Sequence, residues 1–447
     1  MLDRIRELLG GEDDETFQDY KRVLLPTTRE EIVITAGDGP HIDIIRDGEE
    51  QEGVMDATSQ VGTTPFGHRY EPLLEEIRPL YEQDSDFPLM IDGQGYYHPL
   101  QRQLAEELTD IYPGNLSRGD LKVYYCNSGS EAVERGCLKA AQLHRGGNSY
   151  VAFKGAFHGR TSLALSHTTS KPTYTEGFNF LARTFVAPYA SKTGGELHQD
   201  PQENAEACLA ELESRIKTEG PDNINSVLLE SLQGEGGYNV PHPRFMQGVR
   251  ELTREHGIPM IVDEVQAAFR TGEWFGIENF DVQPDMIPVS KTFSGGVEPF
   301  GASLIKDEFA TDEDAKHSGT YGGNAKECFV ALKTIELIRD NHLLQNAEKE
   351  GNYLKERFDK LEQYSIVEES RGIGLFRGIE FRRDGEPSPE LRDRVLHTLL
   401  DEHDVLAEPC GNDNYNTAIR FLLPLTLERR HARELADAVE EAVKEHA

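Results

Sequence analysis

The chain has 447 residues and a formal net charge of −34 at pH 7, because 80 acidic residues outnumber 46 basic ones. The sequence contains no basic stripe that could displace counterions from a nucleic acid, and no run of about 18 apolar residues that could span a membrane. The acids are spread along the chain, so they form an even acidic surface that repels itself until salt screens it. This composition indicates a salt-adapted protein, with an ordinary acidic protein as the alternative.

Five cysteines lie far apart in the sequence, and their number is odd. This pattern predicts neither a disulfide framework nor a zinc or other metal site, and it fits a reducing compartment. The N-terminus is charged and lacks the apolar core of a signal peptide. We therefore expect a cytoplasmic protein.

Residues 1–80 are predicted to form a peripheral N-terminal segment that packs with a smaller domain. Apolar runs at 32–34 and 42–45 predict short strands, and turn residues follow each of them. Further along, His98-Pro99-Leu100 is predicted to open a helix that continues through Leu104 and Leu108.

From about residue 120, predicted strands alternate with predicted helices. The strands are expected at 123–126, 150–153, 227–229, 260–262 and 286–289. Between them, Val133, Cys137, Ala140 and Ala141 share one helical face, and another helix runs through Phe245, Val249 and Leu252 and closes at Gly257. This alternation predicts an α/β fold with a mostly parallel, helix-covered sheet, in a large domain that spans 81–335.

A second, smaller domain of the α+β class is predicted over 336–447. A long helix is expected to begin at Asn324 and to break near Asn341-His342. Strands are then expected near 366–367 and 375–376, and a last helix near the C-terminus contains Leu435, Ala438 and Val443.

Two of the predicted strands end in polar side chains that carry chemistry. Ile261-Val262-Asp263-Glu264-Val265-Gln266 places an acid at one strand end, and Ile287-Pro288-Val289-Ser290-Lys291 places a lysine at another. In an α/β fold such strand ends meet at the crevice where ligands bind. An acid beside a pyridine nitrogen and an amine that forms a Schiff base are what a pyridoxal phosphate site needs. The alternative is two core strands whose ends are solvated.

Three further segments follow predicted strands. Gly129 and Ser130 stand between a predicted strand and a predicted helix, where the free N–H groups of the helix attract anions. The alternative is a plain helix cap, in which Ser128 or Ser130 caps the helix and Glu131 lies in its first turn. In the segment 156–161, Phe157 could stack on a planar cofactor, and Arg160 could bind a carboxylate. The alternative is a phenylalanine in the core beside an arginine on the surface.

The segment 230–237 is rich in glycine and would bring Glu230 and Glu235 close to a ligand. Arg420 lies inside an apolar strand and needs a partner, for which Glu235 is a candidate; a purely structural ion pair is the alternative. The loop 317–324, which contains Thr320, could contact a phosphate or could be a flexible connector that ends in a helix cap.

In this order, these motifs resemble the class III (ornithine/4-aminobutyrate type) pyridoxal-phosphate-dependent aminotransferases. The resemblance covers the chain from about Pro26 to its end and is strongest over 123–324. It implies a fold type I transferase. The sequence departs from the family pattern at Ser290 and Thr292 around the lysine, at Ser231, at Ala325 and at Leu423. These departures remove no chemical group that the reaction needs, but they leave the substrate assignment open.

The resemblance implies a role for each motif residue that holds the cofactor. Lys291 matches the Schiff-base lysine, Asp263 the partner of the pyridine nitrogen, Gln266 the partner of the ring hydroxyl and Glu230 the acid that supports the aspartate. Gly129 and Ser130 match the residues that bind the phosphate. Phe157 matches the aromatic residue that stacks on one face of the pyridine ring, with His158 beside it, and Val265 matches the apolar residue on the opposite face.

The resemblance also implies substrate contacts and a homodimer. Arg420 matches the arginine for the α-carboxylate, Glu235 the acid that covers it when an ω-amine binds, and Arg160 the holder of the distal carboxylate. Thr320 resembles the threonine that is donated to the phosphate in the neighbouring subunit. The implied reaction is transamination with 2-oxoglutarate and glutamate as one partner. The alternatives are an amino-acid racemase, epimerase or aminomutase on the same scaffold, and a non-catalytic binding protein.

Overall fold

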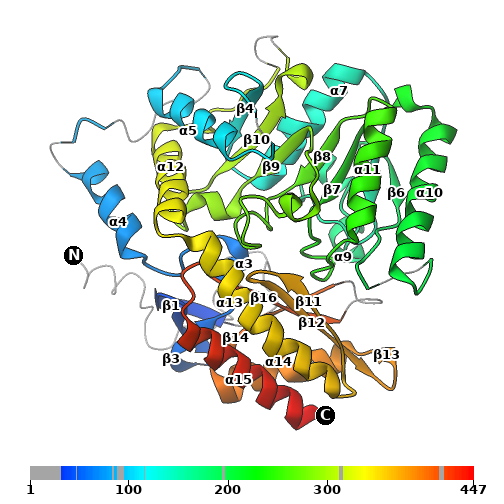
Figure 1. The fold of residues 1–447 in the computed structure, drawn as a ribbon. Coiled ribbons are helices and arrows are strands. Elements are labelled where there is room, and N and C mark those ends of the chain that lie inside the picture. The colour runs from blue at the N-terminus through cyan, green and yellow to red at the C-terminus, as the bar shows by residue number, and fades with distance from the viewer. Residues whose placement is uncertain are drawn as a thin grey trace.

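The computed structural model describes residues 32–46, 48–82, 85–87, 95–114, 116–193, 197–311, 316–411 and 417–447. The charged N-terminal residues therefore lie outside the described part of the chain. No helix among the described residues has the length and apolar character needed to cross a membrane. Three sheets organise these residues, with the largest sheet at the top of Figure 1 and the two smaller ones below it.

The central sheet has seven strands in the order β4-β10-β9-β8-β7-β5-β6. β10 pairs antiparallel with both of its neighbours, and the other pairings are parallel, which confirms the predicted mostly parallel sheet. The strands β6 and β10 were not predicted. The bounds are β4 (Leu121–Cys126), β5 (Ser149–Phe153), β6 (Arg183–Ala187), β7 (Ile224–Glu230), β8 (Met260–Asp263), β9 (Met286–Val289) and β10 (Gly301–Lys306).

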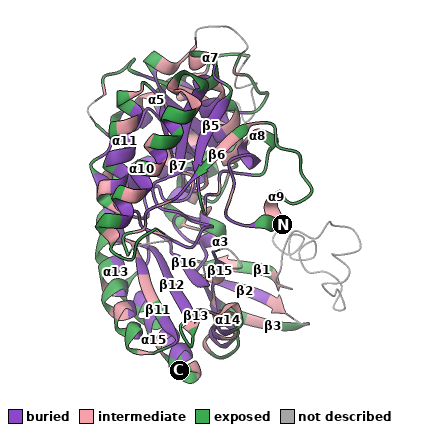
Figure 2. Cartoon of the chain, turned by 90° about the vertical axis from the view of Figure 1, so that its right-hand side faces the viewer, coloured by how far each residue is buried: buried purple, intermediate pink, exposed green. Residues whose placement is uncertain are grey.

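Helices cover this sheet and turn their buried faces towards it (Figure 2). The predicted helix at His98 is α5 (Pro99–Asp110), and the His98 side chain caps it. The predicted helix at Asn324 is α12 (Ala325–Asp340), which Asn324 caps. The other long helices here are α10 (Pro201–Glu219) and α11 (Pro243–Glu255), and the shorter ones are α3 (Ser59–Gly62), α4 (Glu71–Ile77), α8 (Ser162–Leu165) and α9 (Pro172–Thr175).

The helix that follows β4 is continuous but changes its pitch. It consists of α6 (Gly129–Glu131), the π-helical segment η2 (Ala132–Leu138) and α7 (Lys139–Arg145). Gly136 allows this helix to lie directly on β10, because a Cβ at that position would be 1.7 Å from the Ser303 Oγ. Val133 and Cys137 are fully buried, as their shared helical face predicts.

The C-terminal residues form an antiparallel sheet of β11 (Val367–Ile373), β12 (Phe376–Arg383), β16 (Ala418–Leu422) and β15 (Glu408–Cys410), with β13 (Glu386–Pro387) beside β12. The helices of this region are α13 (Leu343–Phe358), α14 (Pro389–His403) and α15 (Arg429–His446). The expected break between α12 and α13 is present, since His342 has a left-handed backbone.

A third sheet joins the two ends of the chain. It contains β1 (Ile32–Asp38), β2 (His41–Arg46) and β3 (Glu49–Asp56), and β14 (Val405–Leu406) pairs parallel with β3. The N-terminal strands therefore share a sheet with a C-terminal strand. The domain boundaries at 80 and 335 remain predictions.

Candidate active site

The carboxyl ends of the parallel strands bring the predicted motifs to one edge of the central sheet. β7 ends at Glu230 and β8 at Asp263, and these two residues are register partners. β9 leads directly into Ser290 and Lys291, which lie at the same edge. β10 runs in the opposite direction, so its first residue, Gly301, pairs with the last residue of β4 at this edge. The strand order therefore brings these side chains to one edge of the sheet directly from the ends of their strands.

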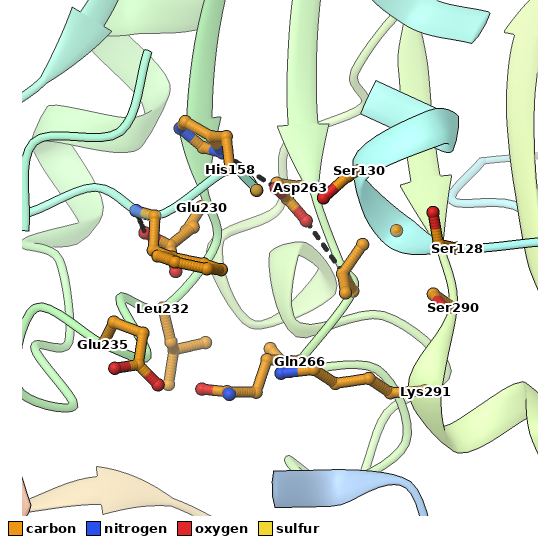
Figure 3. Close-up of a pocket in the computed structure, with 15 residues that line it drawn as sticks. Ser128, Ser130, His158, Glu230, Leu232, Glu235, Asp263, Gln266, Ser290 and Lys291 are labelled. Atoms are coloured by element: carbon orange, nitrogen blue, oxygen red, sulfur yellow. Dashed lines mark hydrogen bonds and ion pairs between the residues drawn. The ribbon is translucent and has the colours of Figure 1, made fainter. Parts of the chain in front are cut away.

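A cavity of about 160 Å³ lies at this edge (Figure 3). Ten of the thirteen residues proposed from the sequence line it, whereas Arg160, Thr320 and Arg420 do not. The lining residues are Ser128, Gly129, Ser130, Phe157, His158, Gly159, Glu230, Leu232, Glu235, Asp263, Val265, Gln266, Ala267, Ser290 and Lys291.

Two hydrogen bonds fix the orientation of the Asp263 carboxylate. Its Oδ2 lies 2.8 Å from Nδ1 of the buried His158, and its Oδ1 accepts a hydrogen bond from the Val265 N–H at 3.0 Å. The close-up shows Asp263 and His158 on one side of the cavity, and Gln266 and Lys291 on the other. The carboxylate is thus held in place and available to a positively charged group inside the cavity.

Lys291 begins the short helix η5 (Lys291–Ser294), directly after the buried strand β9. Its backbone has a φ of 35°, a left-handed value that is strained for a residue with a side chain. Burial lowers the pKa of the Lys291 amine to about 8, although the charge of Glu235 partly opposes this shift. A substantial fraction of the amine is therefore neutral near physiological pH, as a nucleophilic amine requires.

Glu230 accepts hydrogen bonds from the N–H groups of Phe157 at 3.1 Å and Gly234 at 3.0 Å. Burial, together with the neighbouring charge of Asp263, raises the pKa of Glu230 to about 8. Glu230 is consequently mostly protonated at neutral pH, so it adds little negative charge beside Asp263.

The turn that precedes α6 combines a helix cap with an open cavity wall. The Ser128 Oγ accepts a hydrogen bond from the Glu131 N–H at 3.3 Å, so the helix-cap alternative is realised at Ser128. A Cβ at Gly129 would lie 2.8 Å from a methyl carbon of Val265, and therefore only glycine fits here without displacing that side chain. The Ser130 Oγ accepts from the Arg160 N–H at 3.3 Å. Ser128, Gly129 and Ser130 therefore form one wall of the cavity.

Arg420, on β16, has the predicted acidic partner and a second one. It donates from Nη1 to Glu235 Oε1, and from Nη2 to Glu408 Oε2 at 2.5 Å. The other oxygen of Glu235 accepts from Lys171 Nζ at 3.4 Å and from the Tyr174 hydroxyl at 3.2 Å. Burial alone would raise the pKa of Glu235, but the charges of Arg420 and Lys171 outweigh it and lower the pKa to about 2.

Arg160 and Thr320 lie outside the cavity wall. Arg160 is exposed, and its guanidinium stacks over the Tyr174 ring, 4.4 Å from the ring centroid. Thr320 is exposed in the loop before α12. Among the residues to which the sequence assigned no role, Ser290 and Gly159 lie within the predicted motifs. Lys171, Tyr174 and Glu408 are separated from those motifs in the chain and carry no local signal.

Comparison with known proteins places this geometry in a family. The sequence profile described as aminotransferase class-III matches residues 27–443. The chain belongs to the class III aminotransferases. It is 31% identical, over 436 residues, to an acetylornithine aminotransferase from Methanosarcina mazei, and the match covers 97% of this chain and 98% of that protein.

Solved aminotransferase structures have the same fold. The pyridoxamine phosphate (PMP) bound form of a Vibrio fluvialis aminotransferase matches with a TM-score of 0.86 at 25% identity, covering 98% of this chain and 99% of the other. An amine transaminase from an uncultivated Pseudomonas species, in its pyridoxal phosphate (PLP) bound form, matches with a TM-score of 0.84 at 26% identity, covering 95% and 97%. The fold is that of a type I PLP-dependent transferase, and the chain is a PLP-dependent aminotransferase.

The cavity of this aminotransferase fits its cofactor. The Lys291 amine lines the cavity together with the fixed Asp263 carboxylate, and these are the groups that a Schiff base and a protonated ring nitrogen would need. Gln266 Oε1 is buried and has no hydrogen-bond partner within the described residues, so it can accept a hydrogen bond from a ring hydroxyl. Phe157 and Val265 both line the cavity and offer it apolar surface.

Proposed function

We propose that 2-oxoglutarate and glutamate are one keto acid and amino acid pair of this aminotransferase. The observation that carries this proposal is the contact between Arg420 and Glu235 beside the Lys291 amine. Arg420 can bind a carboxylate when Glu235 moves away, and Glu235 can cover Arg420 when a substrate has no carboxylate there. Arg160, exposed near the cavity, would bind the second carboxylate of a dicarboxylic substrate.

We assign the roles of the cavity residues on the same basis. When bound, pyridoxal phosphate supplies an electron sink for the amino-group transfer. Lys291 holds the cofactor between turnovers, and its Nζ then moves a proton to and from the substrate carbon. Asp263, fixed by His158, keeps the ring nitrogen protonated, and the neutral Glu230 supports it without adding a second negative charge.

Gly129 and Ser130 are proposed to hold the phosphate group, and Thr320 is proposed to reach the phosphate in a second copy of this chain. Support for the second contact is that Thr320 is exposed and lies outside the cavity of its own subunit. The resulting homodimer is testable by light scattering of the purified protein, with a monomer mass as the contradicting result. A cytoplasmic location and a salt-adapted host remain proposals that rest on the acidic surface and on five free, buried cysteines.

A half-reaction screen tests the proposed function. The PLP-loaded protein is mixed, at high salt and without keto acid, with glutamate, acetylornithine, ornithine, 4-aminobutyrate and n-butylamine, and the visible absorbance of the cofactor is followed. Glutamate should bleach this band, and 2-oxoglutarate should restore it. If glutamate leaves the band unchanged, or is converted into its mirror image without any keto acid, then the proposed pair is wrong.

A further inference from the structure

Arg420 carries two acidic partners that reach it from different parts of the fold. Glu408 and Arg420 are register partners in the antiparallel strands β15 and β16, so they are neighbours on one face of the C-terminal sheet. Both Nε, at 3.1 Å, and Nη2, at 2.5 Å, donate to the same oxygen of Glu408. Glu235 instead follows β7 of the central sheet and accepts from Nη1.

These two contacts differ in how easily they can be broken. The strand pairing fixes Glu408 next to Arg420, so the acid moves with the arginine. Glu235 meets Arg420 through its side chain, and its backbone C=O accepts a hydrogen bond from the Gly411 N–H, just after β15, at 2.8 Å. Its carboxylate can turn away from Arg420 without moving this backbone contact, and it has Lys171 and Tyr174 as further partners. A substrate carboxylate can therefore replace Glu235 on Nη1, but it finds the edge formed by Nε and Nη2 already occupied by Glu408.

The charges within this network are balanced before any substrate binds. In the described part of the chain, Lys171, Glu235, Arg420 and Glu408 form a continuous line of contacts with two cations and two anions. The side chains of Lys171, Glu235 and Arg420 are no more than 10% exposed, and that of Glu408 is 31% exposed. A carboxylate that enters here adds a negative charge to a largely buried line of contacts whose own charges already balance.

We propose that Glu408 is a specificity-determining residue that weakens carboxylate binding at Arg420. The site then favours primary amines, including ω-amines, that have no carboxylate at the end facing Arg420. Keto acids and α-amino acids still react, but with weaker binding of the carboxylate that replaces Glu235. This inference rests on the proposed function, in which Arg420 faces the substrate.

The test measures carboxylate binding separately from turnover. Glutarate, an unreactive dicarboxylate, is titrated into the PLP-loaded protein by isothermal titration calorimetry. Glu408→Gln keeps the size of the side chain and removes its charge. Glu369→Gln is the matched control, because Glu369 is a partly exposed acid that contacts an arginine of the same sheet, Arg371, away from the cavity. In parallel, the apparent dissociation constant of n-butylamine is measured by the half-reaction.

Glu408→Gln should bind glutarate about tenfold more tightly than the unchanged protein. Glu369→Gln should match the unchanged protein, and n-butylamine binding should stay within about twofold in all three. The tightening should disappear when Arg420→Met is added to Glu408→Gln. If Glu408→Gln does not fold, Glu408→Asp should give a smaller tightening in the same direction, because its carboxylate is one methylene further from the guanidinium.

Unchanged or weaker glutarate binding in the Glu408 variant overturns the inference, as does equal tightening in the Glu369 control. Failure of the proposed function has a different signature, namely that glutamate leaves the visible absorbance of the cofactor unchanged. Tighter glutarate binding in such a protein would still support the effect of Glu408 on Arg420.

Discussion

Glu230 and Asp263 are register partners at the ends of the parallel strands β7 and β8, and both side chains are buried. His158 and the Val265 N–H hold the Asp263 carboxylate, while two backbone N–H groups hold that of Glu230. The protein thus places two acids side by side, and burial raises the pKa of Glu230 to about 8.

Glu230→Gln should remove a pH-dependent loss of stability. The pKa of Glu230 is raised from 4.5 to about 8, so its favourable contribution is fully present below pH 4.5 and is lost as the pH rises through 8. Between pH 5 and 9, the unfolding free energy of the cofactor-free protein should fall by ~2–4 kcal/mol more than that of the variant. Denaturant unfolding at pH 5, 7 and 9 measures this difference. Parallel pH profiles for the two proteins would contradict it, and the exposed Glu445→Gln is the control.

Lys171→Met should impair the use of substrates whose carboxylate replaces Glu235 on Arg420. Lys171 contacts the oxygen of Glu235 that faces away from Arg420, so it stabilises the acid after displacement. The KM for 2-oxoglutarate should rise about tenfold, whereas the rate with n-butylamine in the half-reaction should change little. Tyr174→Phe removes a neutral hydrogen bond from the same oxygen and should have a smaller effect. An equal loss with both substrates would show that Lys171 acts on folding and not on specificity.

Asp285→Asn should destabilise the protein far from the active site. Asp285 is 3% exposed, accepts two hydrogen bonds from Arg250 at 2.5 and 2.7 Å, and lies 3.3 Å from Lys306 Nζ. Loss of its charge leaves two buried cations without an anion, which costs ~3–5 kcal/mol. Asp307→Asn, which breaks an exposed pair with Lys122, should cost less than about 1 kcal/mol. Denaturant unfolding of both variants makes the comparison, and similar losses would contradict the argument.

Added salt should stabilise the protein, since a net charge of −34 repels itself when it is not screened. The Tm should rise by ~5–10 °C between 0.1 and 2 M KCl. Thermal unfolding followed by circular dichroism measures the change. A Tm that is constant or falls over this range would refute the proposal of salt adaptation.

The central sheet and most of the cavity could be predicted because the responsible signals are local. Asp263 and Lys291 each stand at the end of a short apolar strand, and such ends meet at one edge of a parallel sheet. The strand β10 was not predicted, since Ala302 and Ser303 give it little strand character. Glu408 became a partner of Arg420 only through the register of β15 and β16, which depends on pairing between strands and leaves no trace in either segment.

Arg160 and Thr320 show a second limit of prediction from sequence. Arg160 was assigned from a motif whose residue Phe157 lines the cavity, and Thr320 from the loop 317–324, which contributes no lining residue. Neither side chain lines the cavity of its own subunit. Their roles depend on a bound substrate or on a second subunit. A motif in one chain cannot determine such contacts.

The central claim is that Lys291 carries the cofactor, and borohydride reduction tests it most directly. Reduction of the loaded protein should fix the cofactor to one lysine, and peptide mass spectrometry should locate it at Lys291. The Lys291→Ala variant should lose both the label and the visible absorbance, and its turnover should fall by at least about a thousandfold. The control Lys360→Ala, at an exposed position, should retain the label, the absorbance and the turnover. A label on a different lysine, or full activity in Lys291→Ala, would contradict the account.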